Sequence, residues 1–396
     1  MSHRRFVLTL GLLTVATCKR AEPIATGNDA GTNKAPVSTR EAVLRGVGEC
    51  TSVQAKLFAT QADTFEQKAN ALALSPTDEA RKEAQNAWTG AIDEWQKLEV
   101  MQYGPEAIKT QPGGLDLRGP IYAWPLFNRC LIEQQLVSKV YETGFSSLLV
   151  NSRGLGAAEF LLFYGGSDNV CGSTAAINID GTWSTISAGE LASRRAGYIN
   201  TIATNIPSLA HTLSAAWDPA QGNFVNELAQ AGRGSATYKT DQFAFGALND
   251  ALFYVESDVK DMKVARPLGI ANCENETCPE GIESPFAKRG KQHLVNNLAG
   301  FRMVFFGCAA NGNSIDELLV AVGASNIANN VKAALDEADA AIAALKSPDL
   351  QTALTEENGQ FRAVHEALKK LTNILRTEFV TVLDLELPKR IEGDND

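Results

Sequence analysis

The chain has 396 residues, of which 44% are hydrophobic and 21% are charged. This is an ordinary balance for a globular protein, and the length is sufficient for two domains. The net charge of −10 argues against a protein that binds nucleic acid or an anionic membrane surface through a general positive charge. We therefore expect no nucleic-acid partner.

The first 18 residues have the pattern of an export signal. A basic head, MSHRR, precedes the apolar run FVLTLGLLTVAT, which is too short to span a bilayer, and Cys18 follows directly. The segment from Val15 to Cys18 resembles a bacterial lipobox, although Thr17 departs from the usual small residue. The pattern predicts a signal peptide over 1–18, a lipid anchor on Cys18 and a flexible tether over 19–36. The chain is then expected in the periplasm, anchored to a bacterial membrane, and we favour the outer membrane. The alternative is an ordinary secretory signal with an incidental cysteine.

Helical periodicity dominates the rest of the chain. Apolar residues recur every three or four positions in the segment that contains Trp88, Ile92 and Trp95, which marks one face of a helix. Similar patterns occur at 40–72, 129–149, 187–216, 240–263, 290–306, 315–346 and 351–384. We predict an all-α fold of two helical-bundle domains, at 37–220 and 239–391, with long Gly/Pro-rich loops between the helices.

Six cysteines remain after Cys18, and two of them are close in sequence. Cys273 and Cys278 bracket the segment CENETC, which is short enough for a small disulfide loop in an exported protein. A zinc cluster is the competing interpretation, but the sequence has no C-x-x-C pair. We predict the disulfide Cys273–Cys278.

Glu159 is unusual because it lies in the apolar stretch NSRGLGAAEFLLFYGG (151–166). A buried carboxylate needs a partner. One interpretation pairs it with an arginine, for which Arg129, Arg194 and Arg195 are available. The other places Glu159 and Glu99 on one polar cavity that holds a cation or a basic ligand group. We predict a ligand site that includes Glu99, Glu159, Arg129 and Arg195, while Glu99 could equally be a solvent-facing carboxylate at a helix end.

Six segments together resemble the imelysin family. They are AWTGAIDEWQKLEVMQYGP (87–105), WPLFNRCLIEQQLV (124–137), RGLGAAEFLLF (153–163), RRAGYINTIATNI (194–206), ESPFAKRGKQHLVNNLAGFRMVFFG (283–307) and IEGDND (391–396). The resemblance implies two helical bundles with a candidate site between them, an extracytoplasmic location and a link to iron uptake. The family was first described as insulin-cleaving metallopeptidases.

The family's signature, Gly-x-His-x-x-Glu, is incomplete in this chain. Gly154 and Glu159 match it, but Gly156 stands at the histidine position. On a helix, residues three apart share a face, so the family's His and Glu could ligate one metal. Glu159 is then the remaining candidate metal ligand. The sequence does not fix a cofactor, and we expect at most a weakly bound divalent metal, iron or zinc.

The sequence favours a binding or accessory protein, linked to metal or iron acquisition, over an enzyme. Catalytic zinc normally has three protein ligands and a water, and the missing histidine removes the strongest ligand. A metallopeptidase with a non-standard metal site stays open, as does a non-catalytic scaffold or adhesion lipoprotein. The expected partners are the membrane, through the lipid anchor, and a metal or small ligand in a cleft between the domains.

Overall fold

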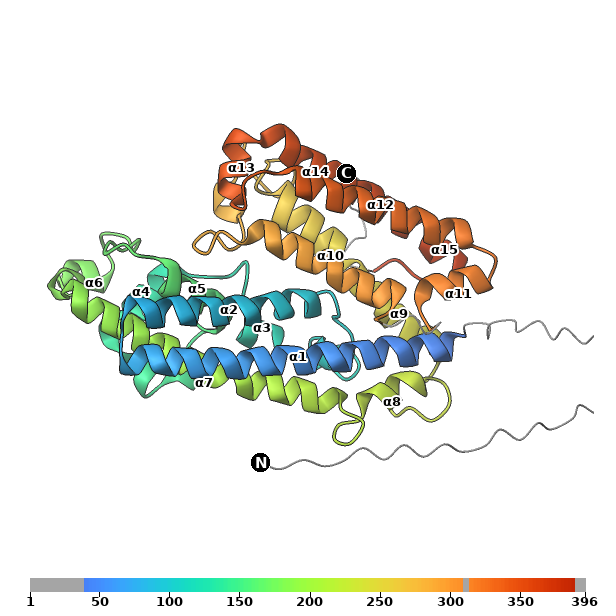
Figure 1. Cartoon of the computed structure of the whole chain (residues 1–396), viewed down its shortest axis with the longest axis horizontal. Helices are drawn as coiled ribbons and strands as arrows, with labels where there is room; N and C mark the ends of the chain where they lie inside the picture. The colour runs from blue at the N-terminus through green and yellow to red at the C-terminus, as the bar shows by residue number, and fades with distance from the viewer. Residues whose placement is uncertain (1–38, 309–312, 389–396) are drawn as a thin grey trace, which may run out of the picture. The chain divides into compact units, whose positions relative to one another are not determined.

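Helices joined by loops make up the described part of the chain, residues 39–308 and 313–388 of a computed structural model (Figure 1). No β-strand occurs among these residues, so the all-α prediction is confirmed. The predicted signal peptide, the lipid site Cys18, the tether and the closing segment 391–396 lie outside the described residues.

The first half of the chain is built around two long helices, α1 and α7, which pack against each other and, through α1, against α2 (Figure 1). Its α-helices are α1 (Arg40–Leu74), α2 (Asp78–Leu98), α3 (Arg118–Ile121), α4 (Arg129–Ser138), α5 (Gly154–Phe163), α6 (Ala176–Ile179), α7 (Ala188–Trp217) and α8 (Phe224–Ala229). Short 3₁₀ turns lie between them: η1 (Gly104–Glu106), η2 (Val140–Glu142), η3 (Phe145–Ser147), η4 (Val150–Ser152) and η5 (Trp183–Thr185).

The start of α2 follows directly from its sequence. The side chain of Thr77 caps the helix by accepting a hydrogen bond from the backbone N–H of Ala80, and two acidic residues follow in the first turn. Both features favour a helix N-terminus. The face predicted from the periodicity is buried, including Trp88 and Trp95.

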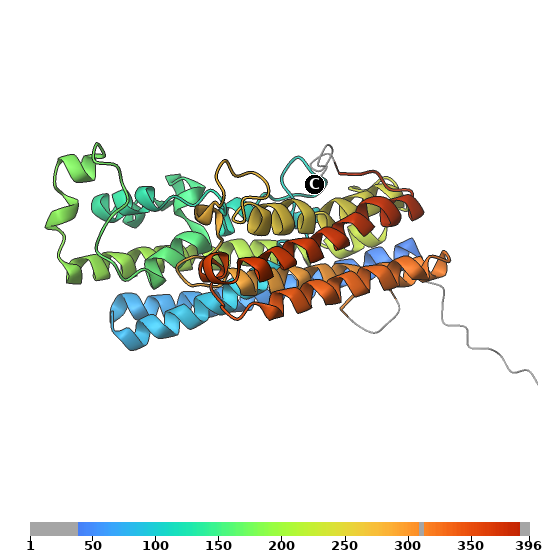
Figure 2. The ribbon, with the colours of Figure 1, turned by 90° about the horizontal axis from the view of Figure 1, so that it is seen from above.

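The second half contains a π-helix as well as α-helices. Its elements are α9 (Asp241–Leu252), the π-helix η6 (Val255–Ala265), the 3₁₀ turn η7 (Pro279–Gly281), α10 (Gly290–Phe306), α11 (Ile315–Ala321), α12 (Ser325–Ala344), α13 (Leu350–Glu356), α14 (Asn358–Ile374), the π-helix η8 (Leu375–Phe379) and α15 (Val380–Val382). Helices α12 and α14 lie side by side, as the orange and red ribbons of Figure 2 show.

Two segments predicted as continuous helices are interrupted. The segment 129–149 leaves the α-helical conformation at Lys139, whose φ of 56° is left-handed. The segment 315–346 divides into α11 and α12 near Gly323, whose φ of 83° suits glycine. Periodicity located the helical residues but not these local stops.

The two halves meet where α2 packs against α10. The helices approach closely at Gly300, because a Cβ atom there would lie 2.3 Å from the backbone oxygen of Lys97. A disulfide between Cys50 of α1 and Cys308, just after α10, also joins the halves. The described residues belong to one compact unit, and the division into two domains stays a prediction.

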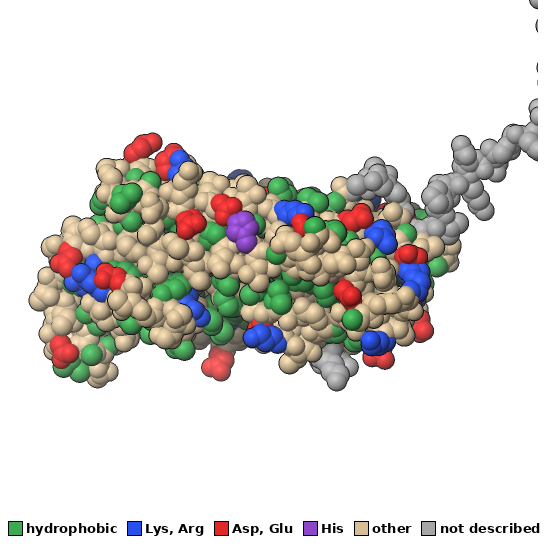
Figure 3. Space-filling view, turned by 90° about the horizontal axis from the view of Figure 1, so that it is seen from below, with side chains coloured by type: hydrophobic (Ala, Val, Ile, Leu, Met, Phe, Trp, Pro, Cys, Tyr) green, Lys and Arg blue, Asp and Glu red, His purple; other side chains and the backbone are tan. Residues whose placement is uncertain are grey.

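The described surface carries charges of both signs. The face in Figure 3 shows acidic and basic side chains interspersed among polar and apolar ones. Within residues 39–308 and 313–388, no helix combines the length and apolar character that a membrane span needs. Cys273 and Cys278 form a disulfide, as do Cys130 and Cys171.

Candidate functional site

A group of buried charged and polar side chains lies where α2, η6 and α10 meet. The ammonium of Lys263 on η6 is surrounded by side chains of Gln96, Glu99, Glu283 and Asn297, and we call these five residues the Lys263 cluster. All five are between 0% and 2% exposed. An isolated buried charge would be strongly unfavourable, so the internal pairing is what permits this arrangement.

Four oxygen atoms lie within ion-pair or hydrogen-bond distance of the Lys263 Nζ. Gln96 Oε1 is at 2.8 Å, Asn297 Oδ1 at 2.9 Å, Glu283 Oε2 at 3.0 Å and Glu99 Oε2 at 3.3 Å. Two of these oxygens belong to carboxylates and two to carboxamides. The ammonium therefore sits in an oxygen-lined cage that carries two negative charges.

Glu99 is held by groups from three parts of the chain. It forms the C-cap of α2, where the helix dipole disfavours a negative charge. Its carboxylate accepts hydrogen bonds from Trp95 Nε1 at 3.2 Å and Tyr254 OH at 2.9 Å. Arg118 Nε lies 3.8 Å away. With Lys263, these donors offset the unfavourable position, so Glu99 is an internal carboxylate and not a solvent-facing one.

Glu283 connects the cluster to two further side chains. Its Oε1 accepts hydrogen bonds from Gln96 Nε2 at 3.1 Å and from Tyr122 OH at 3.0 Å. Its Oε2 lies 3.2 Å from His293 Nδ1. Burial works to raise the pKa of Glu283, but the adjacent Lys263 and His293 outweigh burial and hold the pKa at about 2. Glu283 is therefore ionised at neutral pH.

Glu159 lies on α5 beside this cluster and binds backbone groups. Its Oε1 accepts hydrogen bonds from the N–H groups of Phe286 at 3.0 Å and Ala287 at 2.9 Å. The carboxyl is 3% exposed. Burial raises the pKa of Glu159 to about 7, although the Ala287 N–H and nearby His293 act in the opposite direction. The arginine pair considered from sequence is replaced by these backbone donors.

The three carboxylates of this region converge on Tyr122. Burial raises the pKa of the Tyr122 hydroxyl well above its usual value, and the charges of Glu283, Glu159 and Glu99 raise it further. His293 packs edge-on against the same ring, with the ring centroids 6.4 Å apart. The imidazole is fully buried, and its Nδ1 faces Glu283 Oε2. Glu99 and Glu159 thus belong to one polar region.

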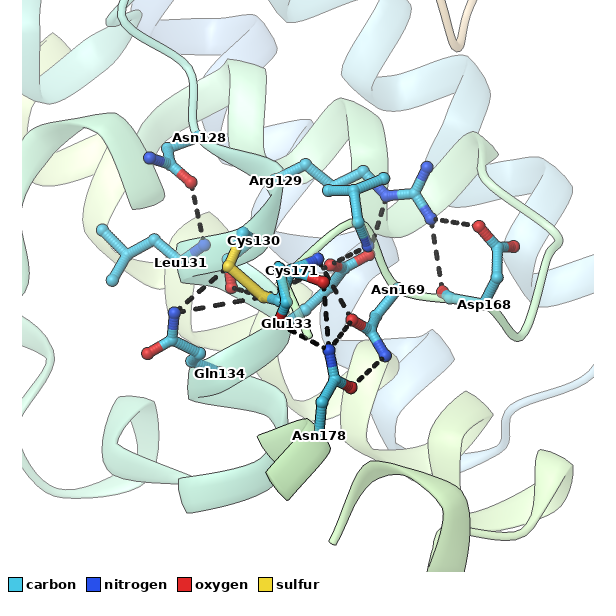
Figure 4. The surroundings of a disulfide bond; sticks show 12 residues. Asn128, Arg129, Cys130, Leu131, Glu133, Gln134, Asp168, Asn169, Cys171 and Asn178 are labelled. Carbon is cyan, nitrogen blue, oxygen red and sulfur yellow. Dashed lines mark hydrogen bonds and ion pairs between the residues drawn. A yellow bond between two sulfur atoms is a disulfide. The ribbon is translucent and has the colours of Figure 1, made fainter. Parts of the chain in front are cut away.

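Arg129 and Arg195 lie elsewhere, against Phe160 and Tyr164 at the C-terminal end of α5. Arg129 Nε donates to Glu133 Oε1 at 2.7 Å, and its guanidinium stacks 4.0 Å from the ring centroid of Tyr164. Arg195 donates to the backbone oxygens of Tyr164 and Gly166. Both arginines hold the segment after α5. Figure 4 shows Arg129 next to the disulfide Cys130–Cys171. The structure does not bring them to Glu99 or Glu159.

The donor set around Glu159 does not fit a divalent metal. Gly156 supplies no ligand, and a Cβ atom there would lie 3.6 Å from the Tyr122 ring, which covers this face of α5. Two N–H groups point their positive ends at the Glu159 oxygen, where a cation would have to bind. In the described part of the chain, no three His, Cys, Asp or Glu side chains are grouped to hold a metal ion.

Comparison with known proteins establishes the family. The model of the imelysin family, which is named as a peptidase family, matches residues 54–377. The chain belongs to the imelysin family. This imelysin-family chain also resembles a solved structure from Parabacteroides distasonis, described as an iron-regulated protein A precursor. The TM-score is 0.64 at 14% identity, over 88% of this chain and 96% of the other, so the likeness shows a shared fold. No functionally curated protein matches.

Sequence reasoning missed most of the residues around Glu99. Lys263 lies on a helical pattern where nothing distinguishes it from an exposed polar residue. Glu283, His293 and Asn297 did lie within one of the segments that resemble the imelysin family, at 283–307. The resemblance of that segment to the imelysin family was therefore the one feature of the sequence that could have pointed to the site residues from the second half of the chain.

Proposed function

We propose that this imelysin-family protein is an extracytoplasmic binding or accessory protein for iron acquisition, anchored to the membrane by a lipid on Cys18. The observation that carries the proposal is the buried, charged Lys263 cluster, which joins α2 of the first half to η6 and α10 of the second. The export pattern before Cys18 supports the location. The similar structure from Parabacteroides distasonis, which is described as an iron-regulated protein A precursor, supports the link to iron.

The chemistry of the site favours binding over catalysis. The carboxylates of Glu99 and Glu283 are neutralised by Lys263 and by side-chain donors, and Glu159 is bound by backbone N–H groups. A general base needs a free lone pair within reach of a substrate proton. Internal pairing of this kind instead fixes α2 of the first half against η6 and α10 of the second half. A fixed arrangement of this kind suits a protein that presents a surface or cleft to a partner.

Growth of the native bacterium under iron limitation tests this function. A strain without the gene is complemented with the wild type, with the variant Glu99→Gln/Glu283→Gln, or with the exposed control Glu280→Gln. We expect the wild type and the control to restore growth and iron uptake, and the double variant to fail at equal protein level. Equal growth of the deletion and wild-type strains would contradict the link to iron.

The anchor has its own test. The variant Cys18→Ser should move the protein from the membrane fraction to the soluble extracytoplasmic fraction, because one thiol carries the acyl attachment. Mass spectrometry of the mature N-terminus should show a lipid-modified Cys18. An unmodified N-terminus beyond Cys18 would contradict the lipid anchor. It would not contradict the role in iron acquisition, which the growth experiment tests.

A further inference from the structure

The four oxygens around Lys263 have the character of a metal cage. Carboxylate and carboxamide oxygens are the ligands that hard divalent cations such as Ca²⁺ and Mn²⁺ prefer. Here Gln96, Asn297, Glu283 and Glu99 direct four such oxygens at one point, at 2.8 to 3.3 Å. The point is occupied by an ammonium, which has only three protons to donate.

The charges of the cage also match a divalent cation. Glu99 and Glu283 contribute two negative charges, and the Lys263 ammonium is the one positive charge at the centre of the cage. A second positive charge, on Arg118, lies outside the cage, with its Nε 3.8 Å from Glu99 Oε1. The five residues of the Lys263 cluster are at most 2% exposed, so water does little to screen their charges. Hydrogen bonds from Tyr254 to Glu99 and from Tyr122 to Glu283 stabilise the remaining negative charge. A cation with two positive charges would balance the two carboxylates.

The position of the ammonium is fixed by more than its oxygen partners. The Lys263 Nζ lies 5.5 Å from the ring centroid of Trp124 and 5.7 Å from that of Tyr254, within the range of cation–π attraction. Lys263 lies on the π-helix η6. Helices of this kind are rare in proteins, and those that occur are often found at functional sites.

We propose that the Lys263 ammonium is the resident cation of this site and takes the place of a divalent metal ion. The site then keeps its shape and charge without metal, and it accepts a hard divalent cation once the ammonium is removed. Calcium–oxygen distances are about 2.3–2.6 Å, so the four oxygens need to close in by less than about 1 Å. This inference rests on the same site as the proposed function, but its test measures metal binding by the purified protein and not iron uptake.

Lys260 provides a matched control on the same π-helix. It is also buried, at 2% exposed, but its ion pairs to Glu256 and Asp261 are made within η6. Neither Glu256 nor Asp261 belongs to the Lys263 cluster. Removing the Lys260 ammonium therefore alters a buried charge of equal size without emptying the cage.

The experiment compares Lys263→Ala with the wild type and Lys260→Ala. Each full-length mature protein is treated with chelator and titrated with Mn²⁺ and, separately, with Ca²⁺, by calorimetry and by thermal melting. We expect Lys263→Ala to bind one cation at least tenfold more tightly than the wild type, with a melting temperature that rises as cation is added. The wild type and Lys260→Ala should show neither effect.

A second variant covers the case in which Lys263→Ala does not fold without metal. In Lys263→Ala/Glu283→Gln the cage has one negative charge fewer, so this protein should fold in chelator and show no gain in cation binding. If Lys263→Ala folds and gains no affinity, or if the double variant gains as much as the single one, the proposal is wrong. Stoichiometric metal in the wild type that Glu283→Gln removes would also overturn it.

Discussion

Two groups of charged side chains differ in what they hold together: the Lys263 cluster, and the arginine cluster of Arg129, Glu133 and Asp168 beside the disulfide Cys130–Cys171. In the arginine cluster, Arg129 pairs with Glu133 four residues away and with Asp168, and the disulfide spans 41 residues (Figure 4). In the Lys263 cluster, Lys263 contacts Gln96, which is 167 residues away. The first cluster fixes one local segment, whereas the second holds together helices from both halves of the chain.

The two clusters also differ in exposure. In the arginine cluster Glu133 is fully buried, but the Asp168 side chain is 62% exposed, so water shares in stabilising one of the two carboxylates that Arg129 contacts. Every side chain of the Lys263 cluster is almost completely shielded. The loss of one partner should therefore be far more damaging in the Lys263 cluster, and this difference can be measured.

The largest effect is expected from Glu283→Ala. This change removes the carboxylate that Lys263 Nζ, Gln96 Nε2 and the Tyr122 hydroxyl share in a buried environment. Removing one member of a buried ion pair destabilises by about 3–5 kcal/mol. The free energy of unfolding from denaturant titration measures the effect. The exposed Glu280→Ala should unfold like the wild type. Equal stability of Glu283→Ala would mean that the cluster does not hold the halves together.

The next effect is a pH dependence that comes from Glu159. Its pKa of about 7 in the folded chain is raised from 4.5, so between these values the folded state keeps a proton that the unfolded state releases. The resulting stabilisation is complete below pH 4.5 and is lost as the pH rises through 7. The loss is on the order of 3 kcal/mol for this shift.

The variant Glu159→Gln removes this titration. Its free energy of unfolding, measured from pH 5 to pH 8, should fall less steeply than that of the wild type, by on the order of 3 kcal/mol over the range. The exposed Glu274→Gln serves as the control and should follow the wild type. Parallel wild-type and Glu159→Gln profiles would show that Glu159 titrates like an ordinary carboxyl.

The smallest effect is expected in the arginine cluster. Glu133→Gln retains an oxygen that can accept the Val170 N–H, and Arg129 keeps Asp168 as a partner. The loss is then one charge-assisted hydrogen bond, worth about 1–3 kcal/mol. Denaturant unfolding measures it, with Asp168→Asn as the exposed control. A loss as large as that of Glu283→Ala would remove the distinction between the two clusters.

The sequence by itself determined the local features. The spacing of Trp88, Ile92 and Trp95 is enough to predict α2, because helical periodicity depends only on neighbours along the chain. Glu159 could be identified as buried from its apolar surroundings, and Cys273 with Cys278 from their short separation. The resemblance to the imelysin family likewise came from continuous segments of sequence.

Tertiary structure decided which of these residues meet. Nothing near Lys263 in the sequence indicates that its ammonium is buried among Gln96, Glu99, Glu283 and Asn297. Those partners come from α2 and its C-cap, from the loop before α10, and from α10 itself. Arg129 and Arg195 looked like suitable partners for Glu159, yet they lie on α4 and α7, where both contact Tyr164. Glu159 instead accepts hydrogen bonds from the backbone N–H groups of residues 286 and 287. The direction of a side chain on a helix follows from local geometry, but its partner depends on how closely distant helices pack, as α10 does on α2 at Gly300.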